Sequence, residues 1–119
     1  MQALIYQASL YGLKFPIRAS GLAPGQSVEL KLDPDYGVAA FVELPSRLPF
    51  GIGRPRRRHL GYLDPEIAER IAPAIKKHAI LRVRIVEIEP AHVRSDGVDQ
   101  ISISVWGDAK ALVPLLHLQ

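Results

Sequence analysis

Cysteine is absent from this sequence of 119 residues. The chain can therefore form no disulfide, no zinc–thiolate site and no thiol nucleophile, and it suits a reducing compartment. The first ten residues lack a basic region and include Gln2 and Gln7, so they do not have the pattern of a secretory signal peptide. No apolar run approaches the roughly 20 residues that span a bilayer. We expect a cytoplasmic protein without a membrane partner.

Acidic residues are missing from one long segment between Glu43 and Asp64. The arginines inside this segment are Arg47, Arg54, Arg56, Arg57 and Arg58. The formal net charge of the chain is only +3, so the clustering of charge is a stronger signal than its total. Guanidinium groups bind phosphates, and clustered cations are typical of nucleic-acid binding. The alternatives are a solvated charged loop and an arm that binds an acidic protein.

Patterns of catalytic and metal-binding residues are also missing. The histidines lack the spacing of a metal site, and Asp33 and Asp35 have no third ligand nearby in the sequence. No serine lies in a nucleophile-elbow context, and the glycines of 51–54 match neither a phosphate-binding nor a dinucleotide-binding loop. We therefore predict a protein that is not an enzyme and that binds no metal and no cofactor.

Alternation of apolar and polar residues predicts a chain built mainly of β-strands. We expect strands over 3–10, with a possible continuation over 15–19, and over 27–32, 38–44, 60–63, 80–89 and 100–106. The alternation changes phase near Ile85 and Val86, which predicts a β-bulge there. Proline and glycine make the arginine-rich stretch 45–59 irregular. Trp106 is expected to be a core aromatic that closes the sheet.

One helix is predicted directly after the predicted strand over 60–63. Asp64 has the side chain of an N-cap, and Pro65 suits the first helical position. The apolar face then repeats at helical spacing as far as Lys77, with Pro73 expected to kink or restart the helix. A second, short helix is predicted over 112–116. The element order favours a single α+β domain over 1–119, mainly β with two helices, as an OB-like or SH3-like small barrel with a helix across one end.

Four separate segments of the chain resemble the HIRAN domain family, which comprises DNA-binding modules of fork-remodelling helicases and stand-alone bacterial proteins. They are Gly12–Phe15, Leu22–Leu30 followed by Asp33, Pro34 and Tyr36, Gly61–Leu63 with Ile67–Pro73, and Val105–Gly107. The resemblance implies an OB-like barrel that binds the 3′ end of single-stranded DNA. Lys14 and Phe15 match the family's basic and aromatic pair, and Tyr36 matches a second aromatic. Gly37 replaces the family's end-reading aspartate, so the resemblance implies single-strand binding more than end recognition.

The sequence thus predicts a non-catalytic module that binds single-stranded DNA or DNA ends. Aromatic rings would stack on bases and cations would hold phosphates. The expected contact residues are Lys14, Phe15, Tyr36, Tyr62, Arg54, Arg56, Arg57, Arg58, Arg82 and Arg84. The module would be an accessory subunit of a helicase, a nuclease or an RNA-guided effector. The alternative is an adaptor subunit whose basic loop docks on an acidic partner.

Overall fold

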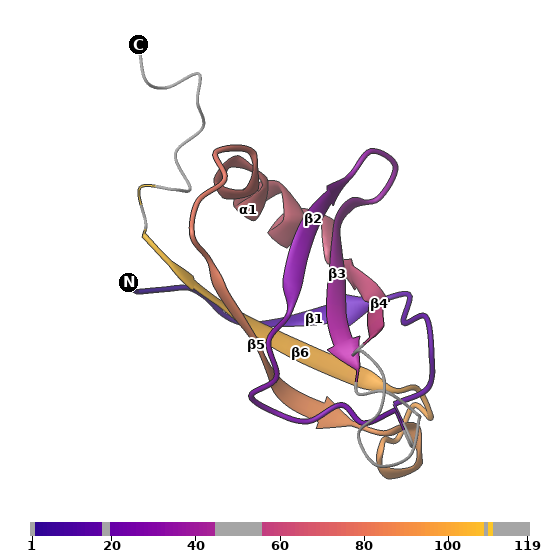
Figure 1. The fold of residues 1–119 in the computed structure, drawn as a ribbon. Helices are drawn as coiled ribbons and strands as arrows, with labels where there is room; N and C mark the ends of the chain where they lie inside the picture. The colour runs from indigo at the N-terminus through magenta and orange to yellow at the C-terminus, as the bar shows by residue number, and fades with distance from the viewer. Residues whose placement is uncertain (1, 18–19, 45–55, 109, 111–119) are drawn as a thin grey trace.

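The computed structural model describes residues 2–17, 20–44, 56–108 and 110. They form one six-stranded sheet with neighbouring strands in the order β2-β3-β4-β1-β6-β5, and every pair is antiparallel (Figure 1). The strands are β1 (Gln2–Tyr11), β2 (Glu29–Asp33), β3 (Gly37–Leu44), β4 (Arg56–Leu63), β5 (Arg82–Glu89) and β6 (Gln100–Gly107). The prediction of a mainly β chain is confirmed, and the sheet is open.

The described residues include the α-helix α1 (Pro65–Lys76) and the 3₁₀ turn η2 (Ala91–Val93). The helix begins as predicted, because Asp64 Oδ1 accepts a 2.8 Å hydrogen bond from the Glu66 amide. A restart of the helix at Pro73 is not found, since α1 includes this residue and continues to Lys76. Ile71 and Ala74 are fully buried on either side of Pro73, and this packing holds the helix together. The predicted helix over 112–116 lies outside the described residues.

Strand β1 connects the two halves of the sheet. It pairs with β6 from Gln2 to Ser9, and at its end Leu10 and Tyr11 pair with Leu63 and Tyr62 of β4. Its register against β6 shifts twice. At the second shift, two residues of β1, Tyr6 and Gln7, lie opposite the single residue of β6 between Ile103 and Val105. Figure 1 shows β1 running between the half formed by β2, β3 and β4 and the half formed by β5 and β6.

The segment that leads into β2 is hydrogen-bonded to the edge strand β5. The Val28 amide donates to the Val83 carbonyl at 3.0 Å, and the Ile85 amide donates to the Gln26 carbonyl at 3.0 Å. The predicted bulge in β5 is confirmed by a register shift between Ile85 and Glu87. These bonds satisfy part of the backbone of an edge that would otherwise be open to other chains.

The sheet has one buried face and one outer face. On β6 the side chains of Ile101, Ile103 and Val105 face the core, and α1 adds Ala68, Ile71 and Ala74 to the same core where it packs against β3 and β2. Ser102 and Ser104, between them on β6, are also buried, with 2% and 5% of their surface exposed. Side chains between the core-facing positions point to the other side of the sheet, which we call the outer face. Trp106 lies there with 38% of its surface exposed, so its predicted core position is wrong.

Two other sequence-based expectations need correction. Residues Arg56–His59 are not irregular but form the first half of β4, which pairs with the end of β3. The proposed strand over 15–19 is not formed by its described residues, Phe15–Ile17. No α-helix of the described residues is long and apolar enough to span a membrane.

Candidate nucleic-acid interface

A bulge in β4 brings three of its side chains onto one face of the sheet. Ala40 of β3 pairs with Gly61, whereas the next residue, Phe41, pairs with His59. Leu60 is therefore the extra residue of the bulge, and its side chain is fully buried. Arg57 and His59 are two residues apart, as is usual for side chains on one face of a strand, whereas His59 and Tyr62 are three apart. The extra residue keeps Tyr62 on the same outer face as the other two.

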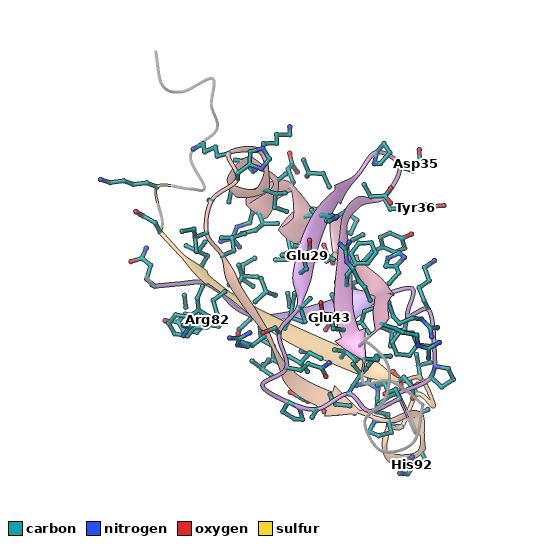
Figure 2. All side chains as sticks on the ribbon, viewed as in Figure 1. Glu29, Asp35, Tyr36, Glu43, Arg82 and His92 are labelled. Atoms are coloured by element: carbon teal, nitrogen blue, oxygen red, sulfur yellow. The ribbon has the colours of Figure 1, made fainter. Side chains whose placement is uncertain are left out.

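Four rings form a continuous row on the outer face across β3 and β4. The Tyr36 and Tyr62 ring centroids are 4.9 Å apart at an interplanar angle of 40°. His59 meets Tyr62 edge-on at 4.7 Å, and it stacks on Phe41 at 4.9 Å with an angle of 25°. We call Tyr36, Tyr62, His59 and Phe41 the aromatic row. Tyr36, at the β2–β3 turn, is 64% exposed and is the most open ring of the row (Figure 2).

Two rings of this row each have a cation over their face. Lys14 Nζ is 5.0 Å from the centre of the Tyr62 ring, and the Arg57 guanidinium carbon is 4.5 Å from that of Phe41. Such cation–ring pairs are worth about 0.5–1 kcal/mol at exposed sites. The Lys14 amide donates to the Leu60 carbonyl at 3.0 Å, so the same bulge positions both the ring of Tyr62 and the backbone of Lys14.

One carboxylate competes for the arginine of this surface. Glu29 Oε2 lies 3.2 Å from Arg57, and Glu29 Oε1 lies 3.8 Å from Lys31. All three side chains are substantially exposed, and exposed ion pairs contribute only about 0–1 kcal/mol. A phosphate group can therefore replace Glu29 as the partner of Arg57 at little cost in stability.

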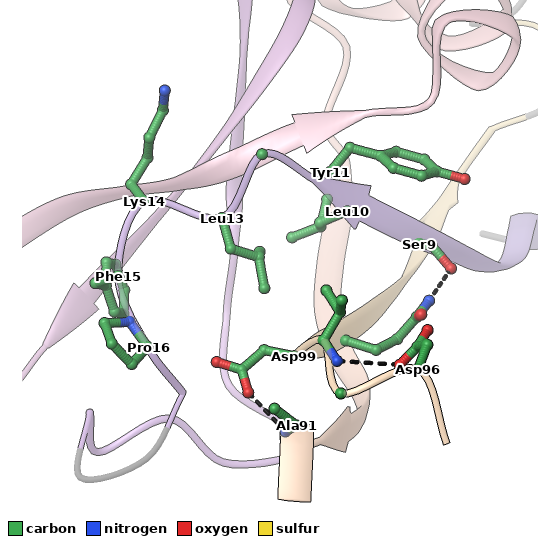
Figure 3. A pocket seen from close by; sticks show the side chains of 14 residues that line it. Ser9, Leu10, Tyr11, Leu13, Lys14, Phe15, Pro16, Ala91, Asp96 and Asp99 are labelled. Carbon is green, nitrogen blue, oxygen red and sulfur yellow. Dashed lines mark hydrogen bonds between the residues drawn. The ribbon is translucent and has the colours of Figure 1, made fainter. Parts of the chain in front are cut away.

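A hollow of about 910 Å³ lies between the end of β1, the segment 12–16 and the turn over 91–100, and Lys14 is one of the residues that line it (Figure 3). Asp99 holds its walls together, because its carboxylate accepts backbone hydrogen bonds from Ile17 at 3.0 Å and from Ala91 at 2.7 Å. These bonds hold the pKa of Asp99 below its usual range. Next to it, hydrogen bonds from Arg94 lower the pKa of Asp96 to about 2.

The bonds of Asp99 predict a pH-dependent contribution to stability. A carboxylate whose pKa is lowered in the folded protein stabilises it above the unfolded pKa, and this contribution is lost as the pH falls through the folded pKa. We expect Asp99→Asn to lower the midpoint of thermal unfolding at pH 7, with the difference from wild type disappearing toward pH 2. Melting curves between pH 2 and pH 7 test this, with the exposed Asp35→Asn as the matched control. A difference that stays constant with pH would contradict it.

The structure brings together only part of the residues that the sequence singled out. Lys14, Tyr36, Tyr62 and Arg57 gather around the aromatic row. Arg56 and Arg58 pair with the buried Leu44 and Val42 and so belong to the other face of β4. Arg58 lies there over the partly buried ring of Phe15, 5.2 Å from its centre. Arg82 and Arg84 are on the outer face but in the other half of the sheet, and Arg54 lies outside the described residues.

Two members of the aromatic row, Phe41 and His59, were missed by the sequence analysis. Phe41 occupies an outer position between the buried Ala40 and Val42, and its alternation in β3 was a signal that could have been used. His59 joins the row only because β4 extends back to Arg56. In the part of the chain that the structure describes, no group of three or more carboxylates and histidines could hold a metal ion.

Comparisons with known proteins do not place the chain in a family. No protein-family model matches it, and neither a curated protein nor a solved structure matches it. The resemblance to the HIRAN family therefore remains an expectation from the sequence.

Proposed function

We propose that this protein is a non-catalytic module that binds single-stranded nucleic acid, in the first place DNA, on the outer face of β3 and β4. The observation that carries the proposal is the aromatic row with Lys14 and Arg57 against its rings. Stacking of a base on a protein ring is worth about 1–3 kcal/mol, and it tolerates any sequence because every base has a π-face. The two cations would pair with the phosphates on either side of the stacked bases.

The HIRAN resemblance supports the same proposal, since Lys14, Tyr36 and Tyr62 are among the residues that carry it. An OB-like arrangement of the sheet and service to a DNA-processing or RNA-guided machine belong to this proposal as well. The adaptor alternative depends on the basic stretch that includes residues 45–55, which lie outside the described residues. Deleting 46–54 would abolish binding of an acidic partner, and leave oligonucleotide binding intact, if the adaptor alternative held.

We further propose that the module binds along a strand and does not recognise its 3′-hydroxyl. Gly37 has a φ of +91°, and a Cβ atom at this position would lie 3.3 Å from the Cβ of Ala68. An aspartate at this position would be strained, which suits the replacement of the end-reading carboxylate by glycine. Asp33 Oδ1 already accepts hydrogen bonds from the Asp35 and Tyr36 amides, so the substitute that the sequence offers is the adjacent, exposed Asp35, and a preference for a 3′-hydroxyl end would point to it. Oligonucleotides ending in a 3′-hydroxyl and in a 3′-phosphate should therefore bind equally well.

The salt dependence of oligonucleotide binding tests the proposal. Anisotropy titrations of a labelled trinucleotide should give a log–log slope of about −0.7 for each phosphate neutralised, and so about −1.4 for Lys14 and Arg57 together. Arg57→Gln should weaken binding and reduce this slope by about 0.7. Glu29→Gln should strengthen binding, because it frees Arg57 for phosphate.

Glu69→Gln on α1 is the matched control for Glu29→Gln. It makes the same change in net charge at an exposed position of the helix, at a residue that pairs with no cation of the aromatic row among the described residues. If both glutamine variants strengthened binding equally, the effect would be one of net charge and not of the site. If the wild-type protein bound no oligonucleotide at low salt, the proposed function would be wrong.

A further inference from the structure

A second pair of exposed aromatic rings lies on the outer face, in the other half of the sheet. Tyr6 of β1 and Trp106 of β6 meet edge to face with their ring centroids 6.5 Å apart. Tyr6 is 80% exposed and Trp106 is 38% exposed. Tyr6 owes this position to the β1 bulge, which places it and Gln7 together on the outer side of the strand. Both rings are therefore open to a ligand that approaches from the outer face.

Two arginines without carboxylate partners flank these rings. Arg82 is directly opposite Trp106 in the register of β5 and β6, and Arg84 is opposite Ser104 (Figure 2 labels Arg82). Neither arginine forms a salt bridge with any of the described residues. The carboxylate further along this face, Glu87, accepts a 2.9 Å hydrogen bond from the side-chain amide of Gln7. Glu87 keeps its negative charge in this bond, but it lies opposite Ser102, whereas Arg82 and Arg84 lie opposite Trp106 and Ser104. The two arginines and the one carboxylate leave a net positive charge on this surface, which suits an anionic ligand.

Strand β1 connects this surface to the aromatic row without a change of face. Tyr11 is opposite Tyr62, and Ser9 is opposite Ser102, which lies on the outer side of β6 although only 2% of its surface is exposed. Tyr11 is itself 53% exposed. From Tyr11 back to Tyr6 the strand rises about 16 Å, at roughly 3.3 Å per residue. That length corresponds to about five nucleotides at the roughly 3.4 Å spacing of a stacked strand.

We infer that Tyr6, Trp106, Arg82 and Arg84 form a second contact for the same single strand, which crosses the outer face along β1 from the aromatic row. This inference rests on the proposed function and adds the length of oligonucleotide that the protein binds best. The rings would stack a base and the arginines would pair with the adjoining phosphates. Strands shorter than about five nucleotides fill only one of the two contacts, and longer strands fill both. The linkage of two contacts on one ligand raises affinity without any change in either contact.

The experiment is a series of oligothymidylates from dT3 to dT15, titrated against wild-type protein and variants. We expect the wild-type affinity to rise steeply once the strand is long enough to reach both contacts. Tyr6→Ala should lower the affinity for dT15 by about fivefold or more and leave that for dT3 unchanged. The double variant R82Q/R84Q should flatten the length series in the same way. Arg70→Gln, at an exposed position of α1, is the matched control for the loss of a guanidinium group.

The outcomes separate this inference from the proposed function. If Tyr6→Ala and R82Q/R84Q left the whole length series unchanged, the second contact would be wrong while binding at the aromatic row would stand. That result would leave the second surface to a protein partner. If Tyr6→Ala weakened dT3 and dT15 equally, the rings would belong to a single site and the inference would also fail. If no length bound, the proposed function itself would fail. Thermal melting of each variant tests whether it is folded. Because the Tyr6 side chain is highly exposed, we expect Tyr6→Ala to fold as the wild type does.

Discussion

Tyr62→Ala is expected to weaken the binding of single-stranded oligonucleotides between about fivefold and about 150-fold, since one stacked base is worth about 1–3 kcal/mol. Tyr62 is at the centre of the site because its ring contacts Tyr36, His59 and the Lys14 ammonium group. Removing it takes away one stacking surface and also the support of its neighbours on both sides. The effect should therefore be near the upper end of the range. Anisotropy titrations at one fixed salt concentration measure it.

Tyr62→Phe is the matched variant, because it keeps the ring and removes only the hydroxyl group. It should bind within a factor of about three of wild type if the ring face is what the ligand uses. Equal losses in Tyr62→Ala and Tyr62→Phe would show that the hydroxyl matters and that stacking on this ring does not. The melting temperature of both variants is needed beside the titrations, because the Tyr62 ring also lies against Gly12 of the β1 end, 3.5 Å from where a Cβ atom there would be.

Gly61→Ala is expected to destabilise the fold by about 1–3 kcal/mol, as overpacking usually does. A Cβ atom at Gly61 would lie 2.8 Å from the backbone carbonyl oxygen of Tyr11 and 3.2 Å from a methyl carbon of Leu13. The need for glycine comes from space and not from backbone conformation, because Gly61 does not have a positive φ. The clash separates β1 from β4 where only two residue pairs join them. Thermal unfolding should show a midpoint lower by at least about 4 °C.

Gly107→Ala provides the control for this prediction. Its Cβ atom would approach the terminal methyl carbons of Leu81 at 2.9 Å and Leu4 at 3.1 Å, which are the far ends of flexible side chains. These side chains can move, whereas the Tyr11 carbonyl is fixed by the strand. We therefore expect a smaller loss of stability for Gly107→Ala than for Gly61→Ala. Equal losses would contradict the idea that close backbone contact makes Gly61 necessary.

The sequence predicts well those features that depend on neighbouring residues. The Asp64 cap and the phase change near Ile85 are examples, since a cap needs only the first turn and a bulge shows as a break in alternation. The β-strand over Arg56–His59 could not be found in this way, because arginines mask the alternation and the stretch adjoins prolines and glycines. Trp106 is different. Its odd-numbered neighbours Ile101, Ile103 and Val105 are the apolar residues that face the core, and their phase already places Trp106 on the opposite face.

Only half of the aromatic row could be predicted, for a related reason. Lys14, Tyr36 and Tyr62 stand at turns and strand ends, where short motifs draw attention to them. Phe41 and His59 meet through the cross-strand register of β3 and β4, and that register is shifted by the extra residue Leu60. A shift of one residue in the pairing of two β-strands moves every side chain of one strand to the other face of the sheet. A site of this kind therefore depends on the register between β-strands, which the sequence pattern within one β-strand does not show.

The pairing of β1 with β6 also has a consequence for how the chain folds during synthesis. Gln2 pairs with Gly107, so among the described strands the one synthesised first, β1, pairs mainly with the one synthesised last, β6. The β2, β3 and β4 hairpins can form early from local contacts, but β1 has only the Leu10 and Tyr11 pairs until β6 has emerged. Contacts between such distant parts of a chain form slowly. Of the described strands, β1, with Tyr6 on it, is therefore the one that stays unpaired longest and most needs shielding from other exposed strands.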